Sequence, residues 1–400
     1  MKNFKSLAGF PESINLTKFK KIEDICKQWV ENVGGTPVLL PMVEKKEIFE
    51  RGIGEGTDVV EKEMIEIKNE TGLVLRPEGT SPAMRLWNNN GGLRNIKPQI
   101  WYYSDFMFRN ESPQAGRFKQ FKQFGVEYLG FNQGITDIDI LISLNSLFTL
   151  LKVRNKLKLK INTIGSKEER VVYLKELKAF LECNKSDLDD ISIQRMEKNP
   201  LRVFDSKNER VIELLKTAPK LFDFLSEDSI QFFDSIKKSL SYLNIDFEVD
   251  YNLVRGLDYY NGLVFEWVYV NNDKAQSAVA AGGRYDCLSK ILGGENVSAI
   301  GFAIGLERLN SLVDEDSQER EGFYICWMDE AKNKALQVAM EYRNNGYKVF
   351  IDQGGRKLVK QIKQADEKNA LYAIIIGKEE LANNYLTVKD LTTGIETKKS

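Results

Sequence analysis

The sequence of 400 residues contains no histidine. This absence excludes Ser-His-Asp and Cys-His catalytic triads, zinc sites with histidine ligands, and the side chain that most often changes charge near neutral pH. Any catalysis must therefore rest on charge placement by Arg, Lys and Glu side chains and by metal ions.

Cysteines and long apolar runs are also scarce. The four cysteines, Cys26, Cys183, Cys287 and Cys326, are far apart and form no Cys-x-x-Cys pair. This spacing argues against a disulfide framework or a cysteine zinc site and favours a reducing compartment. No stretch approaches the ~18 consecutive apolar residues of a membrane helix, and no apolar signal region follows Met1. We therefore expect a cytoplasmic protein without a membrane span.

The charges nearly cancel. The chain has 57 Lys and Arg residues against 58 Asp and Glu residues, for a net charge of −1. This balance argues against a basic coat over the whole surface, although a local basic face remains open.

The apolar pattern predicts a large domain that contains a sheet. The length and the 42% hydrophobic content favour two or three domains. Helical spacing is expected over 16–33 and around 45–51, with a buried strand over 38–41. Aromatic and β-branched runs between 75 and 130 then predict a largely antiparallel sheet.

A helical insertion is expected at about 165–245, because apolar residues there recur on one helical stripe, for example Phe233, Ile236, Leu240 and Leu243. Strand signals return at 254–270, where Asn261-Gly262 has the chemistry of a tight hairpin turn.

The charged segment 311–322 is expected to be a linker after a first domain at 1–310. A small α/β domain should follow at 323–400, because short apolar strand candidates alternate there with helical segments. These candidates are 323–327, 347–351, 371–376 and 385–389.

Residues 108–130 carry the densest set of polar candidates for a site: Arg109, Glu111, Arg117, Gln123 and Glu127. The pattern predicts two antiparallel strands joined by a loop. Strand alternation would then place Arg109 and Glu111 on one face, and Gln123, Gly125 and Glu127 together on one face. Such groups are costly to bury without a ligand, although an exposed charged hairpin remains the alternative.

Two further segments carry candidate binding groups. LRPEGTSPAMR, residues 75–85, places Glu78 and Thr80 on a turn, where a carboxylate and a hydroxyl could hold an ammonium group. VRGLDYYNGLVFEW, residues 254–267, presents Arg255 ahead of two adjacent tyrosines. Because neighbouring strand residues point to opposite faces, only one of the two tyrosines is expected to be functional.

Glycines mark the last two segments. AAGGRYDCL, residues 280–288, is only weakly similar to a phosphate loop, and its glycines are equally typical of close backbone packing. AIGFAIGLERL, residues 299–309, permits a strand-to-helix approach with the guanidinium of Arg308 at its top.

In order and spacing, these segments resemble the class II aminoacyl-tRNA synthetases, and specifically the histidyl-tRNA synthetase family, over nearly the whole chain. LPMVEKKEIFERGIGEGTDVVEKEM, with Pro41, is similar to the first class II motif, which builds the dimer interface. Residues 108–130 are similar to the second motif and 299–309 to the third. LRPEGT, RGLDYY and GGRYD resemble the signatures of the histidine enzyme.

The resemblance implies a fold and a set of partners. The fold is an α+β class II catalytic domain, an antiparallel sheet flanked by helices, with the helical insertion and a C-terminal α/β anticodon-binding domain. GGRKLVKQIKQADEKNALYAIIIGKEEL, residues 354–381, resembles the latter. The implied partners are L-histidine, ATP with Mg²⁺, tRNA(His) and a second copy of the chain, with no protein-bound zinc.

The resemblance also implies roles for individual residues. At ATP, Arg109 and Arg308 would bind phosphates, Arg117 the terminal phosphate, Glu111 the adenine end, and Phe121 would stack under the adenine. At histidine, Glu78, Thr80 and Gln123 would hold the α-ammonium, Glu127 and Tyr260 the imidazole, and Tyr285 would close the pocket. Arg255 would lie at both the α-phosphate of ATP and the carboxylate of histidine. Arg255 and Arg109 would be the catalytic residues.

The chemistry agrees with these roles. When the histidine carboxylate attacks the α-phosphate, negative charge grows on nonbridging oxygens, and preorganised guanidiniums stabilise it better than a flexible ammonium. A pocket that hydrogen-bonds both imidazole nitrogens can discriminate by roughly 10⁴ or more without editing.

Three positions depart from the family pattern. The usual arginine-glycine start is reduced to Ala8-Gly9-Phe10-Pro11, so close to Met1 that we expect no removable targeting segment. Ser112 replaces a frequent arginine that helps to read the extra 5′ guanosine of histidine tRNA, so that readout is not implied here. Lys122 stands where many relatives have a histidine, and should lie outside the reaction centre.

Two other readings remain open. One is a regulatory subunit of histidine biosynthesis that shares the catalytic fold without charging activity, but such paralogues generally lack the terminal domain and the catalytic arginines. The other is a class II synthetase for threonine or proline, against which RGLDYY and the context of Glu127 argue. The lack of histidine is explained equally well by selection against consuming the enzyme's own substrate and by compositional drift.

Overall fold

The computed structural model describes residues 7–13, 16–54, 57–112, 116–206, 208–253, 258–270, 278–314, 320–354 and 356–399. The chain divides into two compact units, 1–313 and 314–400, each with its own core. Within the described part of the chain, no helix combines the length and the apolar content needed to cross a bilayer.

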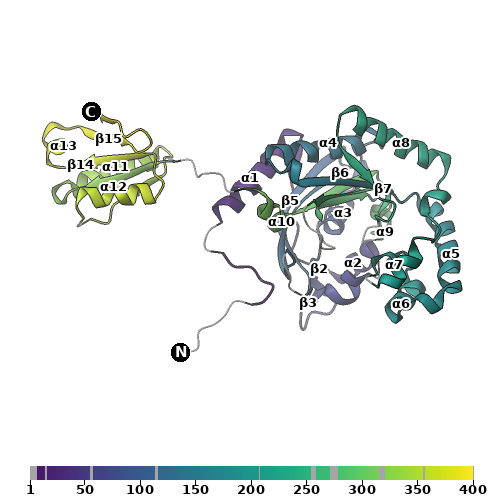
Figure 1. Ribbon diagram of the computed structural model, residues 1–400. Helices are drawn as coiled ribbons and strands as arrows, with labels where there is room; N and C mark the ends of the chain where they lie inside the picture. The colour runs from purple at the N-terminus through teal and green to yellow at the C-terminus, as the bar shows by residue number, and fades with distance from the viewer. Residues whose placement is uncertain are drawn as a thin grey trace. The chain divides into compact units, whose positions relative to one another are not determined.

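An eight-stranded mixed sheet forms the centre of the larger unit (Figure 1). Its strands, in sheet order, are β1 (Gly35–Pro37), β5 (Gln99–Phe108), β6 (Gln120–Leu129), β11 (Ala299–Gly305), β10 (Ala278–Arg284), β9 (Asn261–Tyr269), β7 (Leu157–Thr163) and β8 (Phe247–Val249). The inner pairings are all antiparallel, and only the edge strands β1 and β8 pair in parallel. The predicted largely antiparallel sheet is thus confirmed.

Four helices cover one face of this sheet: α1 (Thr17–Asn32), α4 (Ile135–Leu150), α8 (Glu227–Tyr242) and α10 (Leu306–Leu312). The strands turn their large apolar side chains to this face, as Phe124, Val126 and Tyr128 do from β6. In Figure 1, α1, α4 and α8 lie on the opposite side of the sheet from α2 (Lys46–Ile53). The alternation of β6 therefore leaves Gln123, Gly125 and Glu127 for the other face.

Shorter elements border that second face. They are β2 (Val43–Lys45), β3 (Ile65–Glu66) and β4 (Leu73–Leu75), which form a three-stranded sheet, with η1 (Val59–Glu63), α3 (Thr80–Asn89), η2 (Gly92–Arg94) and α9 (Leu288–Ile291). The short helix η3 (Arg154–Lys156) instead lies on the first face, where Arg154 stacks over the ring of Trp267. Trp87 of α3 and Phe49 of α2 belong to the apolar cluster on this side.

The predicted helical insertion is confirmed. It contains α5 (Lys167–Cys183), η4 (Lys185–Asp187), α6 (Asp190–Lys198), η5 (Pro200–Asp205), α7 (Glu209–Leu215), η6 (Leu221–Phe224) and α8. Its last helix packs Phe233, Ile236 and Leu240 on the sheet, whereas Leu243 follows the helix and is 44% exposed, so that position of the predicted stripe was wrong. The other helices of the insertion pack Tyr173 and its neighbours into the cluster that also contains Tyr260.

Glu169 joins the two ends of the insertion. Its carboxylate accepts hydrogen bonds from the backbone N–H of Ser166 (2.6 Å) and of Ser226 (2.6 Å), at the N-termini of α5 and α8, and from the hydroxyl of Ser229 (3.0 Å). These donors outweigh partial burial and lower the pKa of Glu169 to about 2. Its charge therefore stabilises two helix N-termini at once.

Replacing Glu169 with glutamine is expected to lower the free energy of unfolding by about 1 kcal/mol at pH 7, because an amide loses the charge that favours both helix termini. Since the folded-state pKa is depressed, this stabilisation is present above the ordinary pKa of about 4.5 and is lost as the pH falls toward 2. Urea denaturation of both proteins at pH 7 and pH 3 measures the difference. An equal loss at both pH values would contradict the electrostatic cause.

Asp137 of α4 and Arg284 of β10 form a buried ion pair. The guanidinium of Arg284 donates to both Asp137 carboxylate oxygens (2.6 and 3.0 Å), and both side chains are almost fully buried. Arg284 also donates to Asp286 (2.7 Å), which exchanges two hydrogen bonds of 2.8 Å with Asn261. The GGRYD segment is therefore held by paired side chains, and Arg284 is a scaffold residue.

A five-stranded sheet forms the smaller unit. Its strands, in sheet order, are β13 (Val349–Ile351), β12 (Phe323–Trp327), β14 (Tyr372–Ile376), β15 (Leu386–Asp390) and β16 (Glu396–Lys399), with helices η7 (Asp329–Ala331), α11 (Lys332–Asn344), α12 (Leu358–Glu367) and α13 (Lys378–Asn383). The three strands β13, β12 and β14 are parallel, as expected of a small α/β domain. The four strand candidates of the sequence correspond to β12, β13, β14 and β15.

Two local predictions were wrong. Residues 38–41 form no strand: Val38 continues the pairing of β1 with one bond to Tyr102, and Leu39 is 88% exposed. Asn261-Gly262 does not close a hairpin but begins β9, where the backbone of Gly262 exchanges bonds with residues 164 and 165. Of the expected linker, α10 extends to Leu312, and 315–319 lie outside the described residues.

Candidate active site

The carboxylate of Glu127 is the centre of a buried cluster of polar side chains on the second face of the sheet, which we call the pocket. Glu127 is 1% exposed. Its Oε1 accepts hydrogen bonds from the hydroxyls of Thr80 (2.9 Å) and Tyr103 (3.0 Å), and its Oε2 accepts one from the hydroxyl of Tyr285. Three hydroxyls from three different segments therefore converge on one carboxylate.

Burial controls the electrostatics of Glu127. It raises the pKa of this carboxyl to about 8, and the nearby charge of Glu78 acts in the same direction, whereas the hydroxyl donors oppose the shift. Burial also raises the pKa of Glu78 and holds the pKa of Tyr103 and Tyr285 well above their usual values. At neutral pH the two tyrosines are therefore hydroxyl donors.

Glu78 and Thr80 lie at the start of α3. The Glu78 carboxylate accepts the backbone N–H groups of Thr80 (2.6 Å) and Ser81 (2.9 Å), so it caps the helix. Nearby on β6, the amide oxygen Oε1 of Gln123 is buried and has no hydrogen-bond partner among the described residues. An unpaired buried acceptor on the same face of β6 as Glu127 fits a cationic donor such as an ammonium group.

Glycines make room for this pocket. In the register of the sheet, Gly301 lies opposite Glu127, and Gly125 lies opposite Tyr103. A Cβ added at Gly301 would come within 1.9 Å of the Glu127 carboxylate, and one at Gly125 within 2.1 Å of the Tyr103 ring. Neither contact is possible in a folded chain, so the second and third sequence motifs need glycine here for close approach.

Both tyrosines of the RGLDYY segment are buried, at 3% exposure for Tyr259 and 5% for Tyr260. The prediction that the two tyrosines point to opposite faces of a strand was wrong, because both precede β9 in a covered loop. The ring of Tyr259 lies 4.7 Å from that of Tyr260 and packs edge-on against Tyr285 at 5.7 Å. The charges of Glu78 and Glu127 contribute to the raised pKa of Tyr259, which places it at the pocket.

The sequence did not single out Tyr103 or Tyr259. Tyr103 could have been found from strand parity, because a strand paired antiparallel to β6 brings alternate residues to the face of Glu127. Tyr259 carries no such signal, since its position depends on the loop.

The second group of candidates surrounds the loop between β5 and β6. Arg117 forms an ion pair with Glu111 (2.8 Å), Arg109 lies 3.9 Å from the same carboxylate, and the Arg109 guanidinium stacks over the ring of Phe121 at 5.3 Å. Arg109 and Glu111 follow the end of β5 and are not strand residues, so the predicted alternation for this pair was wrong. The structure still brings these four side chains together.

Arg308 completes this arginine cluster from the first turn of α10. It donates to the carbonyl oxygens of Gly116 (2.9 Å) and Ala278 (2.7 Å). Burial and the charges of Arg117 and Arg109 lower the pKa of Arg308. Three guanidiniums that repel one another around one loop outnumber the neighbouring carboxylates of Glu111 and Glu63, which favours binding of a polyanion.

The expected catalytic residue Arg255 lies outside the described residues. Of the described residues on either side of it, the carbonyl of Leu253 accepts a bond from the side chain of Asn162 (3.1 Å), and the N–H of Asp258 donates to the carbonyl of Ile53 (2.8 Å). Among the described residues, no group of three or more His, Cys, Asp or Glu side chains is arranged to hold a metal ion. The Mg²⁺ implied by the resemblance would arrive with ATP, and Glu111 and the neighbouring Glu63 are carboxylates that could face it.

Lys122 points away from this site. Its ammonium forms an ion pair with Glu23 of α1 (2.7 Å) and lies over the ring of Phe106 at 5.7 Å. At this position, where relatives often have histidine, the side chain therefore ties a strand to a helix on the other face of the sheet.

A mixed sheet with a second-face pocket, an arginine cluster at two motif junctions, and a separate small α/β unit together define a class II aminoacyl-tRNA synthetase. The family model for histidyl-tRNA synthetase matches residues 14–309, and the model for the anticodon-binding domain matches residues 320–399. The chain belongs to the histidyl-tRNA synthetase family.

Solved structures agree with this assignment. Apo S. aureus histidyl-tRNA synthetase is 30% identical to this chain, and its structure matches with a TM-score of 0.80. The match covers 99% of this chain and 97% of the S. aureus chain. Histidyl-tRNA synthetase from Nostoc sp. PCC 7120 has the same fold at 22% identity and a TM-score of 0.72, with 100% and 97% covered. An ATP phosphoribosyltransferase regulatory subunit/histidyl-tRNA synthetase from Bacillus halodurans C shares the fold at 19% identity and a TM-score of 0.64, with 94% and 98% covered.

Proposed function

We propose that the protein is a histidine–tRNA ligase. It would activate L-histidine with ATP to histidyl-adenylate, release pyrophosphate, and transfer the histidyl group to the 3′ end of tRNA(His). The observation that carries the proposal is that a buried carboxylate pocket and a cluster of three arginines lie together at the sequence motifs of this family.

The pocket suits histidine at both ends of the ligand. Glu127 accepts an imidazole N–H, Tyr260 meets the other ring nitrogen, and Tyr285 closes the pocket while it donates to Glu127. The buried Oε1 of Gln123, with Glu78 and Thr80, takes the α-ammonium. A wrong amino acid would leave these buried polar groups without partners, which is costly.

The arginine cluster suits MgATP. Arg109 and Arg308 hold the phosphates, Arg117 reaches the terminal phosphate, Glu111 contacts the adenine end, and Phe121 stacks under the adenine. In the step itself, a histidine carboxylate oxygen bonds to the α-phosphorus while the bond to the β-bridging oxygen breaks and pyrophosphate leaves. Arg109 and the predicted Arg255 stabilise the charge that grows on the α-phosphate oxygens.

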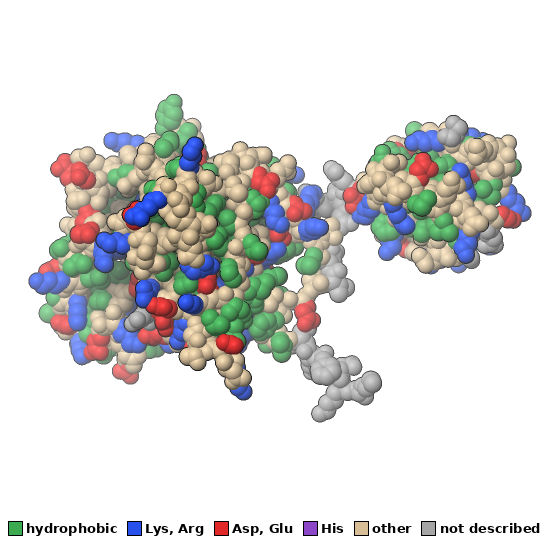
Figure 2. Space-filling view, turned by 180° about the vertical axis from the view of Figure 1, so that it is seen from behind, with side chains coloured by type: hydrophobic (Ala, Val, Ile, Leu, Met, Phe, Trp, Pro, Cys, Tyr) green, Lys and Arg blue, Asp and Glu red, His purple; other side chains and the backbone are tan. Residues whose placement is uncertain are grey.

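The remaining partners follow from the family. The C-terminal unit would bind the anticodon of tRNA(His). A second copy of the chain would cover the first motif, where apolar side chains lie open beside Pro41: Leu39 is 88% and Met42 is 50% exposed. Figure 2 shows acidic and basic side chains interspersed over the visible face, so tRNA contacts would depend on local groups. We place the enzyme in the cytoplasm.

A regulatory subunit is the second candidate function, because the Bacillus halodurans protein, which is named as a regulatory subunit/histidyl-tRNA synthetase, shares this fold. One observation favours the enzyme: Arg109, Arg117 and Arg308 are all present and converge.

ATP–pyrophosphate exchange with purified full-length protein tests the proposal. We expect exchange that requires histidine and is absent with threonine or proline, followed by charging of tRNA(His) on addition of the tRNA. Folded protein without exchange at saturating histidine would favour the regulatory subunit, and exchange with another amino acid would favour a different synthetase.

A further inference from the structure

Arg170 connects the helical insertion to the histidine pocket. It belongs to α5, and its NH1 donates to the backbone carbonyl of Tyr260. The first turn of a helix disfavours a cation, because the backbone dipoles leave positive charge there. Arg170 lies at the end of that turn and is partly buried, and this burial lowers the pKa of its guanidinium. The position of the guanidinium therefore depends on its acceptor, the Tyr260 carbonyl.

Other groups of the insertion hold the same loop. The side-chain amide of Asn199 donates to the Asp258 carboxylate (3.1 Å), and Arg202 lies close enough to oppose the rise that burial causes in the pKa of Asp258. Asn199 itself caps η5 through a bond to Leu201 (3.2 Å), so its direction is fixed. From the other side, Ile53 accepts the N–H of Asp258.

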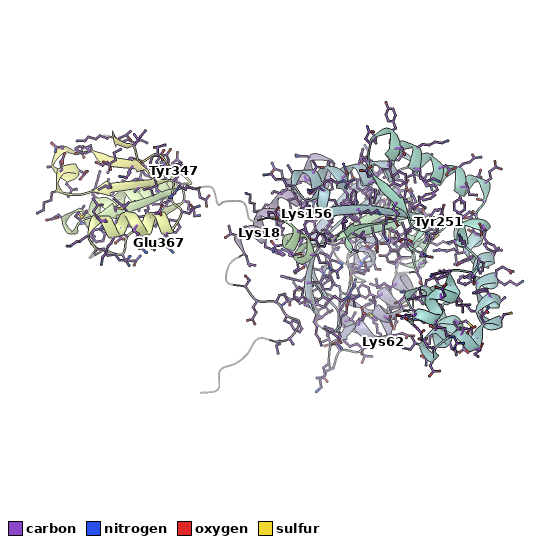
Figure 3. All side chains as sticks on the ribbon, viewed as in Figure 1. Lys18, Lys62, Lys156, Tyr251, Tyr347 and Glu367 are labelled. Atoms are coloured by element: carbon purple, nitrogen blue, oxygen red, sulfur yellow. The ribbon has the colours of Figure 1, made fainter. Side chains whose placement is uncertain are left out.

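Two ion pairs also connect the insertion to the η1 region. Lys198 pairs with Glu61 (2.6 Å), and Arg195 lies 3.9 Å from Asp58. The side chains of these two ion pairs line a surface groove together with Lys62, which Figure 3 labels. These contacts fix the insertion against the rest of the larger unit, and Arg170 extends from it to the pocket.

The bond to Tyr260 affects more than one pocket residue. Tyr260 is followed by Asn261, whose side chain exchanges two hydrogen bonds with Asp286. Asp286 follows Tyr285, which donates to Glu127. A shift of the Tyr260 backbone would thus move the imidazole contact of Tyr260 and, through Asn261, the closing tyrosine.

We propose that Arg170 is a positioning residue for the histidine pocket, so that the helical insertion sets the affinity for histidine through the Tyr260 carbonyl. This inference rests on the proposed function. Arg170 is not among the residues proposed to contact histidine or ATP, and the arginine cluster that would hold ATP is built from other segments.

The test is steady-state exchange by Arg170→Ala with histidine and ATP varied separately. Loss of the donor removes the hydrogen bond that Arg170 makes to the Tyr260 carbonyl, and we expect the KM for histidine to rise about 5- to 20-fold, with the KM for ATP within about 2-fold. Arg170→Lys keeps one donor and a charge, and should recover part of the loss. Calorimetric titration of histidine alone should show the same weakening.

Arg210→Ala is the matched control, because Arg210 lies in the same insertion and pairs with Asp187 at the surface. It should leave both KM values unchanged. If Arg170→Ala does not fold, Asn199→Ala, which removes the side-chain hydrogen bond to the Asp258 carboxylate, should raise the KM for histidine selectively. Equal changes in both KM values, or none, in folded variants of an active enzyme would overturn the inference, whereas a wild-type protein without exchange would instead reject the proposed function.

Discussion

Replacing Arg308 with alanine is expected to lower the rate of histidine-dependent pyrophosphate exchange by about 10³ to 10⁵, the range found for arginines that stabilise charge in phosphoryl transfer. Arg308 donates to two backbone carbonyls, of Gly116 and Ala278, and these bonds aim its guanidinium at the cluster of Arg109 and Arg117. Such a preorganised cation stabilises the transition state more than the bound substrate, so kcat should fall more than the KM for ATP rises.

The conservative variant and a surface control separate this role from folding. Arg308→Lys keeps the charge but loses the planar fork, so we expect a loss of at least about tenfold to remain. Arg94→Ala, which removes an exposed ion pair with Glu295, should change neither activity nor melting temperature. Single-turnover kinetics would assign the loss of activity to the chemical step. A kcat of Arg308→Ala within a few-fold of wild type would refute the role.

The parts of the site that strand parity controls could be predicted from the sequence. Gln123, Gly125 and Glu127 share a face because β6 is a regular strand whose alternate residues, Phe124 and Val126, fill the core. The alternation of bulky and small or polar residues is written in the segment itself. The same holds for the strand-to-helix junction that places Arg308.

The parts that depend on loops and on tertiary covering could not be predicted. Leu39 lies in an apolar run that has the composition of a buried strand, yet it is exposed, because only contacts between distant segments decide burial there. Tyr259 and Tyr260 are both buried because the insertion and α2 cover their loop. The capping of α3 by Glu78 depends on where that helix begins, and boundaries are weakly encoded.

Replacing Glu127 with glutamine is expected to raise the KM for histidine by roughly 10²-fold, because a hydrogen bond to a buried charged acceptor contributes about 1.5–3 kcal/mol. The change keeps the shape of the side chain. The amide oxygen can still accept from Thr80 and Tyr103, and the amide nitrogen can donate to the Tyr285 hydroxyl. The KM for ATP should change by less than about threefold, since the hydrogen-bond partners of Glu127 among the described residues are three hydroxyls and none of Arg109, Arg117 and Arg308.

The pH dependence gives a second test of Glu127. Its raised pKa of about 8 means that the carboxylate, the better acceptor for an imidazole N–H, becomes fully populated only above that pH. The ratio of the variant's KM to that of wild type should therefore increase from pH 6.5 to pH 9, and using the ratio cancels the titration of histidine itself. A ratio that is flat over this range would contradict the role of the ionised carboxylate.

Stability should respond in the opposite direction. Because the folded-state pKa lies above the ordinary value of 4.5, the stability linked to protonated Glu127 is present below pH 4.5 and is lost as the pH rises to about 8. Glutamine does not ionise, so the variant should melt close to wild type at pH 5 and above it at pH 8.5. Weaker histidine binding together with a higher melting temperature would show that the buried charge is retained for substrate recognition at a cost to stability. A lower melting temperature at pH 8.5 would mean that the three hydroxyl donors fully offset the burial of the charge.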